Sequence, residues 1–185
     1  MRFRAFVAAD IEPEERLKDI LTGLRRSGAD LKVVRPELMH VTVKFLGDTE
    51  EDMVDGIASR IDNAVRDVQP FDVKLVGMGA FPSLSNIRVV WVGMEDSGIL
   101  ARTAKRLDDS LVELGFEPDR KGFKPHLTVA RARSTSGMGA VQAILKEKAT
   151  SDFGTYKVGS IRLKKSVLGP QGPAYSDVRT IPLGE

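Results

Sequence analysis

Apolar residues recur along this chain at two spacings, one typical of strands and the other of helices. Residues 2–9 alternate loosely around three apolar side chains and predict a strand, whereas residues 17–24 repeat leucine and isoleucine along one helical face. Gly28 then ends the predicted helix. Residues 87–94 predict a second strand, and the apolar stripe over residues 100–114 predicts a second helix. The order strand then helix therefore occurs twice.

The two copies keep a common spacing. Asp10 and Asp96, each expected just past its strand, lie 86 residues apart, and so do His40 and His126, each of which opens the strand after the helix. A repeat of this length indicates a duplicated half and not a solenoid of short units.

Further elements complete each half. Residues 49–52 resemble a capping box in front of a helix over residues 53–68, and Ser136 is expected to cap a shorter helix around residues 141–145. Strands are expected over residues 71–78, 156–168 and 178–183. The pattern predicts an α+β fold with pseudo-two-fold symmetry, in which two mostly antiparallel sheets flank a central cleft and helices lie outside. We expect residues 1–185 to form a single domain of two interleaved, similar lobes, with the ligand between them.

Composition narrows the classes of function. Apolar runs are far shorter than the roughly 20 residues of a membrane span, and the first residues lack the apolar core of a signal peptide, so we expect a cytoplasmic protein without a membrane partner. The absence of cysteine excludes thiolate chemistry and cysteine-based metal sites. The net charge of +2 is too small for a binder that holds nucleic acid through charge alone, so any anionic ligand needs a local site.

The chain has two histidines, and both stand in the same tetrapeptide pattern, His-x-Thr-Val. In a strand, residues i and i+2 point to one face, so His40 shares a face with Thr42, and His126 shares a face with Thr128. The apolar residues between them point to the core. A two-fold relation between the halves would bring both polar faces to one crevice.

Two imidazoles and two hydroxyls suit displacement at phosphorus. Imidazole has an unperturbed pKa near 6.5, so at neutral pH one ring can act as an acid while the other acts as a base. Threonine hydroxyls would hold the nonbridging oxygens of the phosphoryl group. This chemistry needs neither a metal nor a cofactor. Zinc is the competing interpretation, but it takes three or four protein ligands and would need carboxylates to converge on the two histidines.

The two motifs match the H-x-T-x signatures of the 2H phosphoesterase superfamily, and the chain resembles its LigT-like branch, the RNA 2′,3′-cyclic phosphodiesterases once named 2′-5′ RNA ligases. The resemblance covers almost the whole chain. It is supported by residues 4–8, 45–47, 88–93, Pro125 and residues 169–175.

The resemblance implies a two-lobed fold and hydrolysis of a terminal 2′,3′-cyclic phosphate on RNA to a 2′-phosphate. By the same resemblance, His40 would donate a proton to the leaving 3′ oxygen and His126 would accept one from water. Thr42 and Thr128 would hold the phosphate.

Phe45, five residues after the first histidine, resembles the base-stacking residue of the family, and Arg131, five after the second, resembles its phosphate clamp. Five is odd, so in a flat strand both side chains would face away from the histidines, and a bulge would be needed to redirect them. Otherwise Phe45 packs in the core and Arg131 lies on a solvated edge. Trp91 is expected in the core, and Tyr175 either reaches the ligand or fixes its own loop. Basic residues either face solvent or follow the RNA backbone: Arg120, Lys121, Lys124, Lys164 and Lys165.

We expect a monomeric, metal-independent phosphoesterase that acts on RNA with a 2′,3′-cyclic phosphate end. Three alternatives stay open: reversible 2′-5′ ligation, the same hydrolysis on a small cyclic-phosphate nucleotide, and a noncatalytic module that binds RNA ends. Phosphate-loop, nucleophile-elbow and dinucleotide-binding motifs are absent from the sequence, which argues against ligation driven by a nucleotide.

Overall fold

Two antiparallel sheets form the framework of the computed structural model, which describes residues 1–170 and 172–184. The four-stranded sheet contains β3 (His40–Glu50), β1 (Arg2–Asp10), β8 (Ser160–Gly169) and β9 (Gly172–Pro182), in this order. The five-stranded sheet contains β2 (Leu31–Val33), β6 (His126–Ala132), β5 (Asn86–Glu95), β4 (Phe71–Ser83) and β7 (Asp152–Val158). Every strand pairing is antiparallel. Gln171, within the segment that supports the family resemblance, lies outside the described residues.

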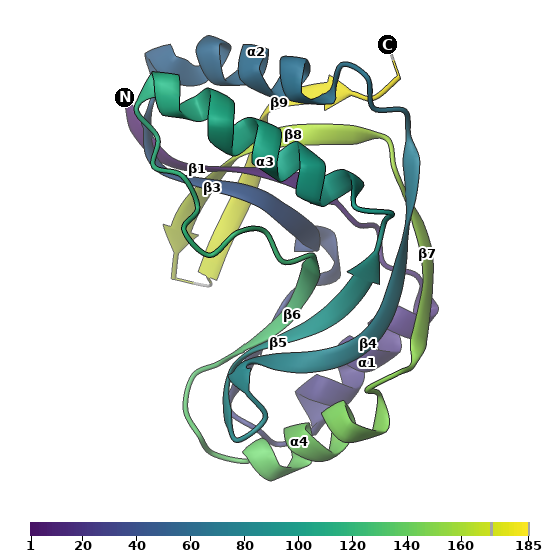
Figure 1. Ribbon diagram of the computed structural model, residues 1–185. Helices are drawn as coiled ribbons and strands as arrows, with labels where there is room; N and C mark the ends of the chain where they lie inside the picture. Colours follow the sequence, from purple (N-terminus) through teal and green to yellow (C-terminus); the bar gives the residue numbers. More distant parts are fainter. Residues whose placement is uncertain (171, 185) are drawn as a thin grey trace.

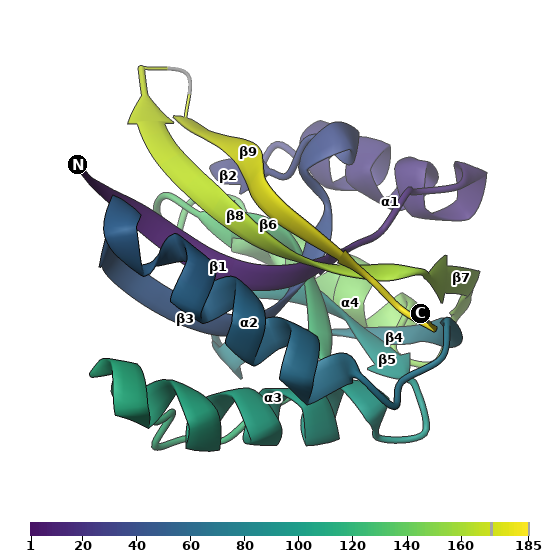
Figure 2. The same cartoon turned by 90° about the horizontal axis from the view of Figure 1, so that it is seen from above.

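The helices divide between the two sheets (Figure 1). Helices α2 (Val54–Val65) and α3 (Ile99–Leu111) lie side by side over the four-stranded sheet, as Figure 2 shows, and α3 contacts β3. Helices α1 (Glu15–Arg26) and α4 (Met138–Glu147) lie beside the five-stranded sheet, where α1 contacts β2 and β7 and α4 contacts β4. Since α1 follows β1 and α3 follows β5, each of these helices packs on the sheet opposite to the strand that precedes it.

Apolar periodicity explains why these helices pack where they do. The four apolar residues of α1 that repeat along one face are all buried, and α3 buries an equivalent stripe. The core therefore lies between each sheet and its pair of helices, and the opposite faces of the sheets are left for polar side chains. The expected α+β class with two antiparallel sheets is confirmed. No helix within the described part of the chain is long and apolar enough to span a membrane.

One predicted strand is divided. Residues 156–168 were expected to form a single strand, but β7 ends at Val158 and β8 begins at Ser160, and the two belong to different sheets. Tyr156 and Val158 are buried before Gly159, and Ile161 and Leu163 are buried after it, so the buried apolar side chains change from even to odd positions. This change of parity marks the point where the chain passes from one sheet to the other.

The predicted capping box at residues 49–52 is wrong. Thr49 is buried inside β3, which pairs with β1 as far as Glu50, and its hydroxyl donates to the carbonyl oxygen of Gly47 (3.2 Å). A 3₁₀ turn, Glu51–Met53, follows the strand directly, and α2 ends before Val68. Strand pairing therefore extends over residues that local sequence assigned to a helix cap.

Ser136 does not cap α4 either. Gly137 precedes the helix with φ 73°, and a Cβ atom at this position would lie 2.7 Å from the Cα of Ala29. Glycine is needed here because the backbone is left-handed and touches a neighbouring segment.

The 86-residue spacing does not make the two aspartates equivalent. Asp10 is the last residue of β1 and pairs with His40, whereas Asp96 lies past β5 and is buried. The carboxylate of Asp96 accepts hydrogen bonds from the backbone N–H groups of Gly98 (3.1 Å) and Leu100 (2.6 Å), at the start of α3. Asp96 thus supports a helix terminus, and Asp10 remains on the sheet.

Candidate active site

The two histidines begin two strands of the same local structure. In β3 and in β6 the first seven residues share one order of buried and accessible side chains. His40 and Thr42 are half-buried, as are His126 and Thr128, while the residues between them are buried. Strands β3 and β6 contact each other, so the two motifs lie where the sheets meet.

Both imidazoles are held in the same way. Nδ1 of His40 lies 2.7 Å from the carbonyl oxygen of Leu38, and Nδ1 of His126 lies 2.6 Å from that of Lys124. A carbonyl oxygen can only accept, so each Nδ1 carries the hydrogen and donates it. This arrangement leaves Nε2 of each ring to accept a proton when the ring is neutral and to donate one when it is charged.

A β-bulge occurs at the same place in both strands. Val7 pairs with Lys44 and Ala8 with Thr42, which leaves Val43 as an extra residue in β3. In β6, Ala130 pairs with Val90 and Thr128 pairs with Trp91, which leaves Val129 as the extra residue. One extra residue reverses the side-chain alternation beyond it.

The bulges return residues 45 and 131 to the faces that carry the histidines. Phe45 and Arg131 are both exposed, and Phe45 with 69% exposure is not a core residue. The Phe45 ring lies 6.4 Å from the ring of Phe6, which in turn lies 4.9 Å from that of His40. Phe45 also borders a hollow of about 340 Å³, which neither histidine lines.

Charges from both sheets reach His40. Burial lowers the pKa of His40 below its usual 6.5, while the hydrogen bond with Leu38 and the carboxylate of Asp10 oppose this effect. The positive charges of Lys164 and Arg131 lower the pKa further. Arg131 lies on β6 and His40 on β3, and these two strands contact each other although they belong to different sheets.

Aromatic rings flank both imidazoles, and only some of them could be predicted from the sequence. Tyr175 from β9 stands edge-on to His40 (5.2 Å between centroids), and Phe81 from β4 stands edge-on to His126 (5.1 Å). Burial raises the pKa of the Tyr175 hydroxyl, and the charge of Arg131 opposes this shift. Tyr175, for which two roles were open, therefore lies against the first histidine. Phe6 and Phe81 were missed because single aromatic residues in strands give no distinctive sequence signal.

Trp91 is not the core residue that was expected. It is half-buried and pairs with Thr128 across β5 and β6, which places both side chains on one face of the sheet. Phe81 packs against the indole at 5.4 Å. A Cβ atom on Gly79 would lie 2.2 Å from the indole, so the glycine lets the ring lie flat on β4. Trp91 thus supports the ring that contacts His126.

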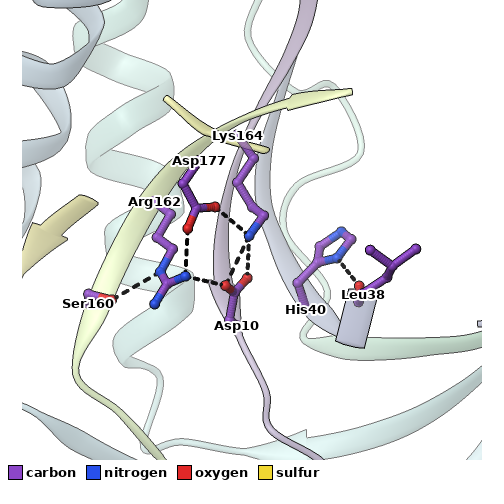
Figure 3. Close-up of polar contacts among 7 residues, drawn as sticks. All are labelled: Asp10, Leu38, His40, Ser160, Arg162, Lys164 and Asp177. Atoms are coloured by element: carbon purple, nitrogen blue, oxygen red, sulfur yellow. Dashed lines mark hydrogen bonds and ion pairs between the residues drawn. The ribbon is translucent and has the colours of Figure 1, made fainter. Parts of the chain in front are cut away.

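Four charged side chains form a closed network beside His40 (Figure 3). Lys164 Nζ lies 2.9 Å from both carboxylate oxygens of Asp10 and 2.7 Å from Asp177. Arg162 bridges the same two carboxylates at 2.8 and 2.7 Å. Lys164 is therefore buried in ion pairs and does not face solvent.

The other basic residues differ in their surroundings. Lys165 lies over the ring of Phe3 (5.2 Å to its centroid), whereas Arg120, Lys121 and Lys124 are exposed in the segment before His126. Within residues 1–170 and 172–184, no three histidine or carboxylate side chains come together as a metal-binding group.

Comparisons with known proteins find relatives along nearly the whole chain. The family model of the 2′-5′ RNA ligase superfamily matches residues 12–165. The RNA 2′,3′-cyclic phosphodiesterase of Methanothermobacter thermautotrophicus is 36% identical over 191 residues, covering 99% of this chain and 100% of that protein. The corresponding Archaeoglobus fulgidus protein of the same name is 39% identical over 179 residues, covering 95% and 98%.

Solved structures show the same fold. The crystal structure of a Thermus thermophilus protein matches with a TM-score of 0.81 and 29% identity, over 97% of each chain. Escherichia coli LigT, solved in complex with 3′-AMP, matches with a TM-score of 0.75 and 21% identity, over 100% of both chains.

Proposed function

Because the chain belongs to the 2′-5′ RNA ligase superfamily, we propose that it hydrolyses RNA 2′,3′-cyclic phosphate ends to 2′-phosphates through its two histidines, without a metal. Relatives at 36% and 39% identity, aligned over nearly their full length, carry the name RNA 2′,3′-cyclic phosphodiesterase. The observation that carries the proposed mechanism is the repeated histidine arrangement, in which each Nδ1 is fixed by a backbone carbonyl and each Nε2 is left for proton transfer.

The proposed reaction is a single displacement at phosphorus. Nε2 of neutral His126 takes a proton from water as the water oxygen bonds to phosphorus. The bond from phosphorus to the 3′ oxygen breaks, and Nε2–H of protonated His40 gives its proton to that oxygen. The products are a 2′-phosphate and a free 3′ hydroxyl, with one proton taken up by His126 and one released by His40. Each proton transfer contributes typically ~10²–10⁴-fold to the rate.

Other residues of the site would bind the substrate. The hydroxyls of Thr42 and Thr128 would donate to the nonbridging oxygens, and the guanidinium of Arg131 would pair with their charge. The exposed ring of Phe45 offers a face on which a base can stack. We propose that the protein acts as a monomer in the cytoplasm.

An end-group assay tests this function. The protein is incubated in EDTA with an oligonucleotide that ends in a 2′,3′-cyclic phosphate, and the product is identified as a 2′- or 3′-phosphate. We expect a 2′-phosphate, with activity reduced at least about 100-fold in His40→Ala and in His126→Ala. Thr42→Val should also lose activity, while Thr155→Val, an exposed threonine of β7, serves as the matched control. Turnover that survives either histidine substitution, or that requires a metal, would reject the mechanism.

Ligation is a second candidate because the family model carries that name. Joining a cyclic phosphate to a 5′ hydroxyl uses the same proton transfers in reverse and consumes no nucleotide. Adding RNA with a 5′ hydroxyl to the same assay measures it. If the ligated product still forms in His40→Ala and His126→Ala, ligation does not take place at this site. If the protein binds the RNA but neither hydrolyses nor ligates it, the protein is a noncatalytic module that binds RNA ends.

A further inference from the structure

The two histidines face different neighbours on the adjacent strand. His40 pairs with Asp10 of β1, whereas His126 pairs with Gly93 of β5. A Cβ atom on Gly93 would lie 2.6 Å from the carbonyl oxygen of Val76, so this position has no space for a side chain. The site is therefore repeated in its histidines and threonines, but a carboxylate stands beside only one of the two imidazoles in these strand pairs.

Asp10 is held in place by two cations. Lys164 contacts both of its carboxylate oxygens at 2.9 Å, and Arg162 contacts one of them at 2.8 Å. The Lys164 side chain is 10% exposed and that of Asp10 is 31% exposed, so water screens their charges only in part. Asp177 completes the network from β9 and keeps both cations paired. Figure 3 shows that Asp10 and Lys164 are the members of this network on the side of the His40 ring, with Arg162 and Asp177 farther away.

Each element packed around His40 contributes a charged or titratable group. These groups are Asp10 from β1, Lys164 and Arg162 from β8, Asp177 and Tyr175 from β9, and Arg131 from β6. Burial is the largest influence and lowers the pKa of His40, and the charges of Lys164 and Arg131 act in the same direction. The carboxylate of Asp10 is the charge that opposes them.

We infer that Asp10 is a positioning residue that favours the proton on His40 and so makes the two histidines of a repeated site unequal. Its catalytic consequence rests on the proposed function, because the acid in that reaction must hold a proton before the substrate reacts. The glycine opposite His126 gives that ring no such partner, which suits the base. Lys164 and Arg162 fix the carboxylate and moderate its effect.

Titration of the histidine rings by NMR tests the inference without relying on activity. The chain has only two histidines, so a His126→Asn variant assigns both ring signals. In Asp10→Asn, we expect the midpoint of His40 to fall by about half a unit to one unit, because an attractive charge is lost. In Lys164→Gln, which keeps a donor for the carboxylates, the midpoint should rise.

Asp177→Asn is the matched control. It removes a carboxylate from the same two cations, but Asp177 does not pair with His40 in the sheet as Asp10 does, and Figure 3 shows Lys164 between Asp177 and the His40 ring. Its effect on the His40 midpoint should therefore be clearly smaller than that of Asp10→Asn. Structural damage alone would shift the His40 midpoint in the same direction in all three variants. Equal shifts in Asp10→Asn and Asp177→Asn, or shifts of one sign in Asp10→Asn and Lys164→Gln, would overturn the inference.

The kinetic measurement is the pH dependence of kcat/KM. On the alkaline limb of this profile, activity falls as the catalytic acid, His40, loses its proton. In Asp10→Asn this limb should move to lower pH with the NMR midpoint, and activity at neutral pH should fall about three- to tenfold. If the wild type shows no turnover, the proposed function fails while the NMR result still decides the role of Asp10. If turnover occurs and the limb does not follow the midpoint, the inferred role in catalysis is wrong.

Discussion

Gly79 lies under the only tryptophan of the chain, and adding a single methyl group there is a direct test of the packing beneath His126. A Cβ atom at residue 79 would lie 2.2 Å from Cζ2, 2.5 Å from Cη2 and 2.8 Å from Cε2 of Trp91. Ordinary contact begins at 3.4 Å, so the indole must withdraw by about an ångström. The indole also packs against Phe81, with 5.4 Å between the ring centroids, which restricts the movement of the ring.

The expected cost of Gly79→Ala is that of overpacking, about 1–3 kcal/mol in the free energy of unfolding. This exceeds the ~0.4–1 kcal/mol that alanine gains by restricting the unfolded chain. Gly23→Ala is the matched control, because Gly23 lies within α1 and a Cβ atom added there would meet nothing within 4 Å. The control should gain about 0.5–1 kcal/mol.

Urea unfolding followed by circular dichroism measures both changes, with the slope m checked for constancy. Trp91→Phe removes the part of the indole that collides, so the double variant Gly79→Ala with Trp91→Phe should lose less stability than the sum of the single variants. A coupling of about 1 kcal/mol or more is expected. Because Phe81 contacts both Trp91 and His126, Gly79→Ala should also lower kcat. A Gly79→Ala variant as stable as the wild type, or strictly additive changes, would refute this account of the packing.

Three further predictions concern other parts of the site and its supports. Phe45→Ala should change the free energy of unfolding by less than about 0.5 kcal/mol, because the ring is 69% exposed. It should raise KM for cyclic-phosphate RNA, because about 1–3 kcal/mol of base stacking is lost. An unchanged KM would contradict the stacking role. Lys44→Met should lower the free energy of unfolding in urea by about 3–5 kcal/mol, because Lys44 is buried against Asp108 (2.5 Å) and the Glu117 carbonyl (2.7 Å). The control Lys105→Met, which breaks an exposed ion pair, should lower it by only about 0.3–0.5 kcal/mol. Similar losses in the two variants would show that the Lys44 pair is not a buried, stabilising contact. The pKa of His40 is lowered in the folded state, so below pH 6.5 the native protein binds fewer protons than the unfolded chain. The contribution of neutral His40 to the free energy of unfolding is therefore complete above pH 6.5 and is lost as the pH falls below that value. Thermal unfolding between about pH 8 and pH 5 should therefore show a steeper acid loss in the wild type than in His40→Asn, and parallel curves would exclude this linkage.

Local pattern predicted the elements and the histidine pair, because both depend on short-range periodicity. The stripe of α1 and the alternation around Thr42 and Thr128 fix which faces are buried, and the structure agrees with them. The odd spacing of Phe45 and Arg131 even required a bulge, which both strands contain.

What the sequence could not predict depends on pairing between distant strands. Asp10 acquires its role because β1 and β8 bring it beside His40 and Lys164, residues that lie 30 and 154 positions away. Thr49 was assigned to a helix cap because its local sequence suits one, yet pairing of β1 with β3 kept it in the strand. Long-range pairing overrides local preference at such positions.

The bulges at Val43 and Val129 give the repeated site a direction. Each is followed two residues later by a side chain on the histidine face, an aromatic ring in one copy and a guanidinium in the other. A ligand with an apolar end and an anionic end that lies between the two copies can satisfy both groups in one orientation only. Exchanging Phe45 and Arg131 would reverse that preference, so the orientation of such a ligand depends on these two residues.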